Sequence, residues 1–381
     1  MIEPRGHYIH QGHVLDVLRK LPETSVHCVV TSPPYWGLRD YGLPPQVWGG
    51  EAGCGHAWGE EARKTSSPQR DHGVGGGFGE TRGIEPSRAG MAFVASLGAF
   101  CRCGAWRGSL GLEPTPELYV EHLVIVFREV RRVLRGDGTL WLNLGDSYNG
   151  HAGGRKGLSR PDIAPQRSGV NTPGLKPKDL VGIPWRVAFA LQADGWYLRA
   201  DIIWAKPNPM PESVRDRPTK AHEYVFLLSK SERYYYDAKA IAEPSIHAGR
   251  VVSYDGTQRN ATEIGDVVND RRTAPGASGP RDILVKPTRN RRSVWRCDPT
   301  TDVWDVSTKP YKGAHFATFP PDLVRPCVLA GCPTGGVVLD PFMGSGVVLA
   351  VGKELNREAW GIELKQEYIV MAEQRVAGVK L

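Results

Sequence analysis

The sequence has no long hydrophobic run. Its 381 residues contain no stretch of about 18 apolar residues, which predicts that no segment spans a membrane. The opening segment, MIEPRGHYIHQGH, lacks the apolar core found in secretion signals. Cysteine is scarce and odd in number, at seven, so the disulfide framework of a secreted protein is not expected. These absences favour the reducing cytoplasm as the location.

The remaining composition is that of a folded, loop-rich protein. Hydrophobic residues make up 40% of the chain and charged residues 23%, which excludes wholesale disorder. Glycine (45 residues) and proline (30 residues) are abundant, and they indicate many loops rather than a helical bundle. The net charge of +7 favours a polyanionic partner without identifying it.

Short apolar runs alternate with helical patterns along most of the chain. The runs predicted as strands are 26–32, 139–144 (entered by a turn at 136–138), 200–206, 223–229, 336–340 and 360–364. Because these runs are continuously apolar, they indicate strands covered on both faces, as in a parallel sheet. Helices are predicted at 117–134 (after the cap residue Thr115 and Pro116), 180–193, 321–330, 346–356 and 365–377. The alternation predicts an α/β fold with a doubly wound sheet.

Three stretches interrupt this alternation: the glycine-rich segment 49–111, the polar segment 150–178 and the irregular segment 245–312. Within 271–296, eight lysines and arginines face a single acid, Asp282, so this window carries +7. A solvated loop would explain such a charge run. Its position outside every βα unit, with Trp295 among the charges, favours contact with a polyanion.

The first chemical motif is Ser32-Pro33-Pro34-Tyr35, which follows the predicted strand at 26–32. Sites in α/β sheets lie at the carboxyl ends of strands. Two successive prolines stiffen the backbone and remove its N–H donors, which leaves carbonyl acceptors beside an aromatic ring. Such a loop suits a planar ring that carries an amino group, although a rigid turn with a packed tyrosine would show the same pattern.

The second motif is Asp340-Pro341-Phe342-Met343-Gly344-Ser345-Gly346, between a predicted strand and a predicted helix. Glycines at such a junction let a ligand approach the backbone and the helix N-terminus. Glu363 ends the next predicted strand, where an acid commonly binds ribose hydroxyls. The loop lacks the full GxGxxG pattern, which disfavours a nicotinamide cofactor.

In this order the two motifs resemble the amino-group DNA methyltransferases that use S-adenosylmethionine, in the permuted (beta-class) arrangement. Segments 136–148, 201–230 and 315–323 also look like segments of that family. The resemblance implies a circularly permuted, Rossmann-like methyltransferase sheet with an inserted DNA-recognition region. It also implies duplex DNA as the partner, a role in restriction–modification and a nucleoid-associated location in the cytoplasm, and it leaves room for a homodimer.

The resemblance also divides the chain into parts. The expected parts are a catalytic part at 1–48 and 112–240, a glycine-rich insert at 49–111, a target-recognition region at 241–310 and a cofactor-binding part at 311–381.

The family mechanism assigns roles to residues at matching positions. Ser32, Pro33, Pro34 and Tyr35 would receive a flipped base, with acceptors from Ser32 and the Pro33 carbonyl on its amino group and Tyr35 stacked on its ring. The cofactor would be held by Asp340, Phe342, Gly344, Ser345, Gly346 and Glu363, with Thr318 and Phe319 beside its methionine part. In the family, serine before Pro-Pro mostly marks cytosine N4, and aspartate or asparagine mostly marks adenine N6. Ser32 therefore predicts N4-methylcytosine, with N6-methyladenine as the alternative. A non-catalytic DNA-binding protein is a second hypothesis, and an RNA or free-nucleoside substrate is a third.

Two details depart from simple expectations. Where family members often read Gln-Gly-Asp, with the aspartate near the cofactor adenine, this chain reads Gln11-Gly12-His13. In this chain His13 or the backbone would make the contact with the cofactor adenine instead. The Pro326-Cys327 pair is shared with cytosine carbon-5 enzymes, but it precedes the glycine loop and sits in a helical pattern. Cys327 is therefore predicted to be a core residue, and covalent attack on cytosine is rejected.

Four metal-capable residues cluster in the glycine-rich insert: Cys54, His56, Cys101 and Cys103. Two pairs of such ligands can form a closed tetrahedral zinc site. The CxH and CxC spacings are tighter than usual, and unremarkable reduced thiols are the alternative. A segment too rich in glycine to build a core would gain order from a metal, so a structural zinc is predicted.

Overall fold

The computed structural model describes residues 6–379 except 39, 60–62, 66–93, 97, 150–173, 208, 210, 213, 246–247, 249–250, 255–280, 285 and 296–319, and at 63–65, 94–96, 251–254, 281–284 and 294–295 it describes the backbone alone. Thr318, Phe319, most of the 150–178 segment and residues 271–280, 285 and 296 of the basic window therefore lie outside the described residues.

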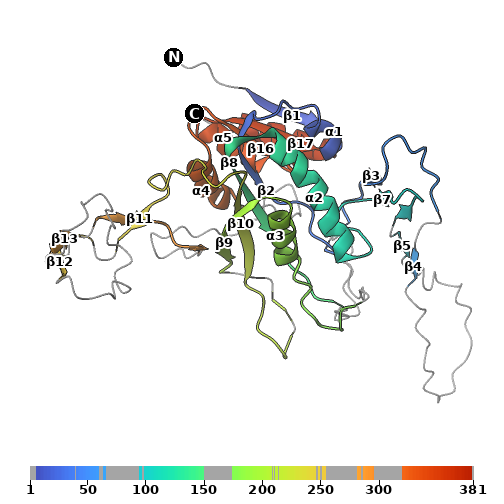
Figure 1. Cartoon of the computed structure of the whole chain (residues 1–381), viewed down its shortest axis with the longest axis horizontal. Coiled ribbons are helices and arrows are strands. Elements are labelled where there is room, and N and C mark those ends of the chain that lie inside the picture. The colour runs from blue at the N-terminus through green and yellow to red at the C-terminus, as the bar shows by residue number, and fades with distance from the viewer. Residues whose placement is uncertain are drawn as a thin grey trace, which may run out of the picture.

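Among the described residues, a mixed sheet of eight strands forms the centre of the molecule (Figure 1). Its strands, in spatial order, are β1 (His7–Gln11), β17 (Glu358–Glu363), β16 (Val337–Asp340), β2 (Val26–Thr31), β8 (Leu134–Leu144), β10 (His222–Ser229), β9 (Tyr197–Ala205) and β15 (Val294–Trp295). From β1 to β8 each strand runs parallel to its neighbour. The parallel pair β16 and β2 brings together the two strands that precede the predicted motifs, which lie over 300 residues apart in the chain.

The expectation of a wholly parallel sheet is wrong for β10, which runs antiparallel to both β8 and β9. A parallel connection needs a crossover, usually a helix, and no described residue between β9 and β10 is helical. Strand β10 therefore returns beside β9 as in a hairpin. Its continuous apolar run reflects burial on both faces, a property that does not depend on strand direction.

Helices cover both faces of the sheet, which confirms the doubly wound arrangement. On one face lie α1 (Val14–Leu18), α2 (Pro116–Val133) and α3 (Ile183–Ala193), which pack with alternate strand residues such as Leu140, Leu142 and Leu144. The other face carries α4 (Pro321–Gly331) and α5 (Val347–Glu354), which pack against Trp141 and Val225. Helix α6 (Gln366–Ala377) packs on α5. None of the described helices combines the length and apolar character needed to span a bilayer.

The predicted helices and strands match the observed ones closely, with local differences. Helix α2 begins as expected, because the Thr115 side chain accepts a hydrogen bond from the Leu118 amide at 3.2 Å. The turn expected at 136–138 is instead an irregular part of β8, where the β2–β8 pairing steps from Val26–Leu134 to Cys28–Thr139. Strand β1 and helix α1 were not predicted, since each has only five residues and β1 alternates between exposed and half-buried positions.

Smaller sheets belong to the interrupting segments. In the insert, β3 (Gln46–Trp48), β7 (Trp106–Gly108) and β6 (Ala99–Phe100) pair in this order, and β4 (Arg63–Thr65) pairs with β5 (Val94–Ser96). The insert's sheet thus includes three residues before its expected start at 49. Beyond β10, β11 (Glu243–Pro244) pairs with β14 (Thr288–Arg289), and β12 (Val251–Tyr254) with β13 (Arg281–Leu284). These two sheets extend from the side of the molecule opposite the insert (Figure 1).

Candidate functional site

One edge of the central sheet gathers the chemical motifs. Strands β1, β17, β16, β2 and β8 are parallel, so their carboxyl ends meet at this edge. Because β10 is antiparallel, its first residues, His222 and Glu223, also lie there: Tyr224 pairs with Leu144 at the end of β8. The motif after β2, the motif after β16 and the start of β10 therefore surround a common region.

Side chains from distant segments converge on Tyr35. The Tyr35 hydroxyl lies 2.8 Å from both Asn143 Oδ1 and Glu223 Oε2, and the Ser32 hydroxyl lies 3.2 Å from the Tyr35 oxygen. Burial and the nearby Glu223 carboxylate raise the pKa of Tyr35 well above its usual range, so the phenol stays protonated. The ring rests against Gly145, where an added Cβ would lie 2.5 Å from it. Tyr35 is thus held rigidly by packing and by hydrogen bonds.

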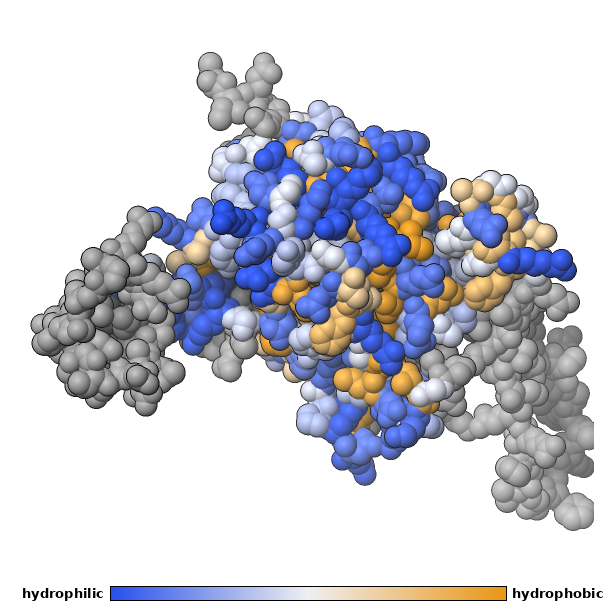
Figure 2. All heavy atoms as spheres, viewed as in Figure 1, coloured by the Kyte–Doolittle hydropathy of each residue, from blue (hydrophilic) through white to orange (hydrophobic). Residues whose placement is uncertain are grey.

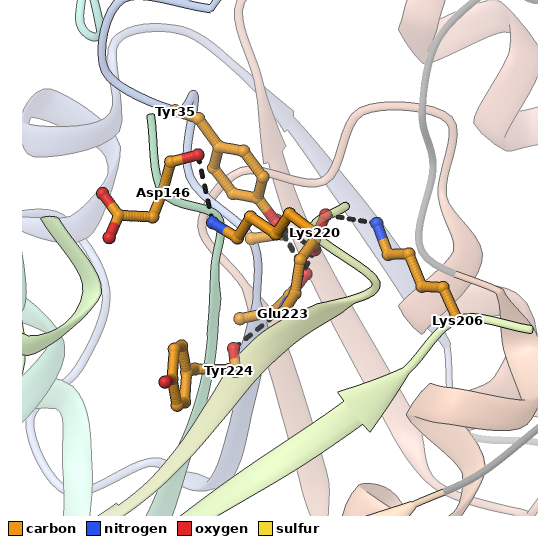
Figure 3. A network of polar contacts seen from close by, with 8 residues as sticks. Tyr35, Asp146, Lys206, Lys220, Glu223 and Tyr224 are labelled. Atoms are coloured by element: carbon orange, nitrogen blue, oxygen red, sulfur yellow. Dashed lines mark hydrogen bonds and ion pairs between the residues drawn. The ribbon is translucent and has the colours of Figure 1, made fainter. Parts of the chain in front are cut away.

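Glu223 is the hub of this network (Figure 3). Besides Tyr35, its carboxylate accepts a hydrogen bond from Asn143 Nδ2 at 3.3 Å and pairs with the Lys206 ammonium. Nearby, Lys220 donates to the Asp146 carbonyl at 3.1 Å. The Asp146 carboxylate in turn accepts from the amides that begin α3. The sequence gave no signal for Asn143 or Lys206, which reach the site only through the pairing of β8, β10 and β9.

The carbonyls of the two prolines differ in what they contact. The Pro34 carbonyl accepts a hydrogen bond from the Tyr119 hydroxyl at 2.8 Å. No hydrogen bond among the described residues is recorded to the Pro33 carbonyl. The loop therefore retains a carbonyl acceptor next to Ser32, as the sequence predicts.

The glycine loop after β16 is tied to Glu363 by main-chain hydrogen bonds. One carboxylate oxygen of Glu363 accepts from the Gly344 amide at 3.0 Å, and the other accepts from the amides of Leu364 and Lys365. Gly344 has a positive φ of 51° and no atom within 4 Å of an added Cβ, so the backbone there faces open space. Gly346 also has a positive φ, but it packs against Ala372 of α6 at 2.6 Å from an added Cβ. The first glycine leaves the backbone accessible, and the second permits close helix packing.

Asp340 is fully buried between the two motifs. Its Oδ1 accepts hydrogen bonds from the Thr31 hydroxyl at 2.7 Å and the Phe342 amide at 3.0 Å. Its Oδ2 has no hydrogen-bond partner among the described residues. Burial raises the pKa of Asp340 to about 7, with a further contribution from Glu363. A buried carboxylate with an unused oxygen favours a cationic ligand nearby.

A pocket opens between the glycine loop and the stem of the insert. Its lining residues come from the ends of β1, β2, β16 and β17 and from both sides of the insert: Gly12, His13, Val14, Pro34, Leu43, Gln46, Trp48, Ser109, Leu110, Pro341, Phe342, Ile362, Glu363 and Leu364. The His13 ring stands edge-on to Trp48 at 4.7 Å. Burial lowers the pKa of His13, and its Nε2 is buried without a hydrogen-bond partner in the part of the chain that the structure describes.

The insert is anchored to α2 by stacked aromatic rings. The His122 ring lies between Trp48 and Trp106, at 5.4 and 5.3 Å. His122 Nδ1 lies 3.0 Å from the buried Glu113 carboxylate, whose other oxygen accepts from the Gly111 amide. Hydrophobic atoms gather at the right of Figure 2, where the insert joins the body. The stem of the insert is therefore part of the main hydrophobic core.

The four predicted metal ligands lie together in the insert. The ligand atoms of Cys54, His56, Cys101 and Cys103 are all within 4.8 Å of one another. Hydrogen bonds from the backbone amides of Ala105 and Glu51 lower the pKa of Cys103 to about 6, which favours the thiolate at neutral pH. Two thiol groups, a partly ionised thiol and an imidazole form a donor set of the kind that zinc prefers.

Two other expectations from the sequence can be compared with the structure. Cys327 lies buried in α4, with its thiol 3.3 Å from the Leu323 carbonyl, and burial raises its pKa well above the usual range. It is a core residue, as predicted. In the basic window, Arg289 and Arg292 both form ion pairs with Glu243 of β11, at 2.9 and 2.7 Å. The positive charge of this region is thus partly compensated by an acid outside the window.

Comparison with known proteins identifies relatives along nearly the whole chain. The sequence model of the N6/N4 methyltransferase family, described as DNA methylase, matches residues 26–374. The type II methyltransferase M.XycI of Xanthomonas campestris pv. cyanopsidis is 40% identical over 379 residues, which cover 98% of this chain and 89% of the relative. M.Cfr9I of Citrobacter freundii is 39% identical over 382 residues, covering 99% and 90%.

Among solved structures, the PvuII DNA methyltransferase (cytosine-N4-specific) superposes with a TM-score of 0.51 at 16% identity. The match covers 96% of this chain and 85% of that protein. At this identity the likeness concerns the fold alone.

Proposed function

Because the chain belongs to the N6/N4 DNA methylase family, we propose that it transfers a methyl group from S-adenosylmethionine to the N4 amino group of cytosine in duplex DNA. The observation that carries this proposal is the juxtaposition of the Ser32–Tyr35 loop and the glycine loop at the ends of the adjacent strands β2 and β16. A methyl donor bound at one loop would meet an amino group bound at the other.

The residues around Tyr35 explain how an amino group could become nucleophilic. The amino nitrogen of cytosine is conjugated with its ring and attacks poorly. Acceptors at the Pro33 carbonyl and the Ser32 hydroxyl would hold its hydrogens and orient its lone pair toward the methyl group. The Tyr35–Asn143–Glu223 network fixes that loop before the base arrives, which is electrostatic preorganisation rather than covalent catalysis. The target base has to leave the duplex to reach this loop.

The cofactor fits the observed donors and acceptors. Asp340 offers a buried carboxylate with an unused oxygen, and S-adenosylmethionine carries a positive sulfonium. Gly344 presents open backbone, and Glu363 retains acceptor capacity for ribose hydroxyls beside Phe342. When bound, the cofactor would supply the electrophilic methyl group and be left as S-adenosylhomocysteine. The methylated amino nitrogen would then release one proton to solvent. In this proposal Ser345 and Gly346 shape the loop, and Thr318 and Phe319 stay predicted neighbours of the methionine part.

We infer further that the cluster of Cys54, His56, Cys101 and Cys103 binds one structural zinc ion. The support is the mutual proximity of the four ligand atoms, which come from two segments 47 residues apart. Metal analysis of purified protein should find about one zinc per chain, and the double variant Cys101→Ser/Cys103→Ser should lose it. A metal-free preparation of folded protein would refute the site.

The division of the remaining chain follows the family. In this proposal residues 1–48 with 112–240, and 311–381, form one permuted methyltransferase domain, and 241–310 recognises the target sequence. A homodimer stays a prediction, which light scattering would test. Association with the nucleoid is expected because duplex DNA is the proposed substrate.

The methylated nucleoside produced in the reaction identifies the base that the protein modifies. Purified protein is incubated with duplex DNA and labelled cofactor, the DNA is hydrolysed, and the modified nucleoside is identified by mass. N4-methyl-2′-deoxycytidine is the expected product because Ser32 stands before the prolines. N6-methyl-2′-deoxyadenosine alone would establish the alternative, and the absence of transfer to any DNA would leave a DNA-binding protein.

A further inference from the structure

The metal cluster and the cofactor pocket are joined by the same small sheet. Trp48, the last residue of β3, lines the pocket, and Cys54 and His56 follow it within eight residues. Cys101 and Cys103 lie in the turn from β6 to β7, and Trp106 of β7 pairs with Trp48. Whatever fixes the two ligand pairs together therefore also fixes the strand that carries Trp48.

The insert forms one side of the pocket. Leu43, Gln46 and Trp48 line it from the chain entering the insert, and Ser109 and Leu110 line it from the chain leaving it. Trp48 is only 2% exposed, and its Nε1 donates to the Gly108 carbonyl at 3.1 Å, which joins the two sides. On the opposite side of the pocket stand Phe342 and Glu363.

Next to Trp48, His13 supplies a buried polar atom without a described partner. Its Nε2 is buried, and its ring touches Trp48 at 4.7 Å. One face of the buried indole is stacked on His122, so Trp48 backs His13 and closes the side of the pocket. An imidazole nitrogen at such an apolar wall suits the edge of a planar heteroaromatic ring that carries hydrogen-bonding groups. Adenine, the base of the proposed cofactor, is such a ring.

The strands that carry Trp48 have little stability of their own. Strands β3 and β7 have three residues each and β6 has two, and hairpins this short are marginal in water. Gly49 and Gly50, which follow Trp48, both have positive φ. Gly50 packs so closely on Ala105 that an added Cβ would lie 2.5 Å from the alanine Cβ. A cross-link between the ligand pairs holds this approach in place.

We propose that the metal at the Cys54, His56, Cys101 and Cys103 cluster holds Trp48, which packs against His13, as part of the adenine-binding wall of the pocket, so that cofactor affinity depends on metal occupancy. This inference rests on the proposed function in two respects, the zinc ion at the cluster and the identity of the ligand as S-adenosylmethionine. It gives the insert a role in the reaction that is separate from DNA recognition.

Calorimetric titration with S-adenosylhomocysteine tests the proposal on the full chain. Three samples are compared: protein as purified, protein stripped with a chelator, and stripped protein reloaded with zinc. We expect stripping to raise the Kd about tenfold or more and zinc to restore it. Equal affinity in stripped and reloaded protein would overturn the inference. If the purified protein fails to bind S-adenosylhomocysteine at all, the proposed function fails, which is a different result.

Variants distinguish the contribution of the pocket wall from that of the metal. Cys103→Ser should weaken binding as stripping does, whereas Arg102→Ser, an exposed neighbour between two ligands, should not. Trp48→Phe keeps every metal ligand and should weaken binding at unchanged zinc content, with Trp185→Phe in α3, outside the insert and the pocket, as its control. If circular dichroism shows that chelation unfolds the chain, Trp48→Phe decides the matter, and unchanged affinity in that variant would refute the role of the wall.

Discussion

The two loops that meet at the edge of the sheet are held in different ways. The glycine loop after β16 is fixed by backbone amides that donate to Asp340 and Glu363, all within one βαβ unit. The Ser32–Tyr35 loop is fixed by side chains from β8 and β10, up to 188 residues away. The donors in the glycine loop are main-chain amides, which any residue except proline supplies, so only the two carboxylates are essential to its hydrogen bonds. The Tyr35 network depends on each of its side chains. The glycine loop should therefore tolerate more substitutions than the Ser32–Tyr35 loop.

The largest effect is expected from Glu223→Gln. This change removes the negative charge that pairs with Lys206 and accepts from Tyr35, so the Ser32–Tyr35 loop loses its support. We expect kcat to fall on the order of 100-fold, a typical cost of losing one preorganised polar group, with little change in cofactor affinity. Glu232→Gln, at an exposed position, is the matched control. A kcat for Glu223→Gln close to that of its control would remove the network from the mechanism.

Asp340→Asn should change how the protein responds to pH. The raised pKa of about 7 means that the folded protein binds more protons than the unfolded chain between about pH 4 and 7. Stability of the ligand-free protein should therefore fall as pH rises through this window, and Asp340→Asn should remove that fall. A cationic cofactor prefers the ionised carboxylate, so cofactor affinity should rise about tenfold between pH 6 and 8 in the native protein.

Urea unfolding and calorimetric titration at several pH values measure both trends for Asp340. The asparagine variant serves as the reference, because asparagine has nearly the same volume as aspartate but does not titrate. Any titration of the cofactor itself is the same with both proteins. Parallel pH profiles in the two proteins would show that Asp340 does not titrate in this range.

Ser32→Ala should have a smaller effect on turnover. The Ser32 hydroxyl makes only long contacts, at 3.2 Å to Tyr35 and 3.3 Å to Asn143, so the loop should keep its conformation. We expect kcat to fall about tenfold, with unchanged binding of S-adenosylhomocysteine, because the hydroxyl is proposed to contact the target amino group. Ser25→Ala provides the comparison. If cofactor affinity changed instead, Ser32 would be assigned a contact with the cofactor rather than with the target base.

The smallest effect is expected from Glu243→Gln. This carboxylate pairs with Arg289 and Arg292, so its removal exposes more positive charge to a polyanion. Duplex DNA should bind about twofold to threefold more tightly at low salt, with a log–log salt slope steeper by up to about one. Glu367→Gln, which removes an exposed charge from α6, is the charge-matched control. Equal slopes in the two variants would move DNA contact away from this region.

Local chemistry explains which parts of the site could be predicted from sequence. The prolines of the Ser32–Tyr35 loop, the glycines of the second loop and Glu363 lie directly after their own strands, so their positions could be predicted from short motifs. The grouping of the four proposed metal ligands could be predicted because they form two close pairs, 54–56 and 101–103, in a glycine-rich segment. The strands and helices followed from apolar periodicity, except β1 and α1, which are too short to show a period.

The roles of Glu223, Asn143 and Lys206 could not be predicted, because they depend on strand direction. In a wholly parallel sheet Glu223, at the start of its strand, would lie at the edge far from Tyr35. The antiparallel course of β10 reverses this and brings the carboxylate to 2.8 Å from the tyrosine hydroxyl. A continuous apolar run indicates that both faces of a strand are buried, but it does not indicate whether the strand is parallel or antiparallel to its neighbours.

The spacing of the four proposed metal ligands has a consequence for engineering the chain. The ligand pairs at 54–56 and 101–103 close the chain at the base of the insert. With metal bound, the position of the pocket wall therefore does not depend on how many residues lie between the two pairs. The entropy of closing a loop grows only with the logarithm of its length, and doubling the length costs about 0.6 kcal/mol. The stretch between Trp58 and Ala99 should therefore accept an inserted tag or reporter domain while methyl transfer continues.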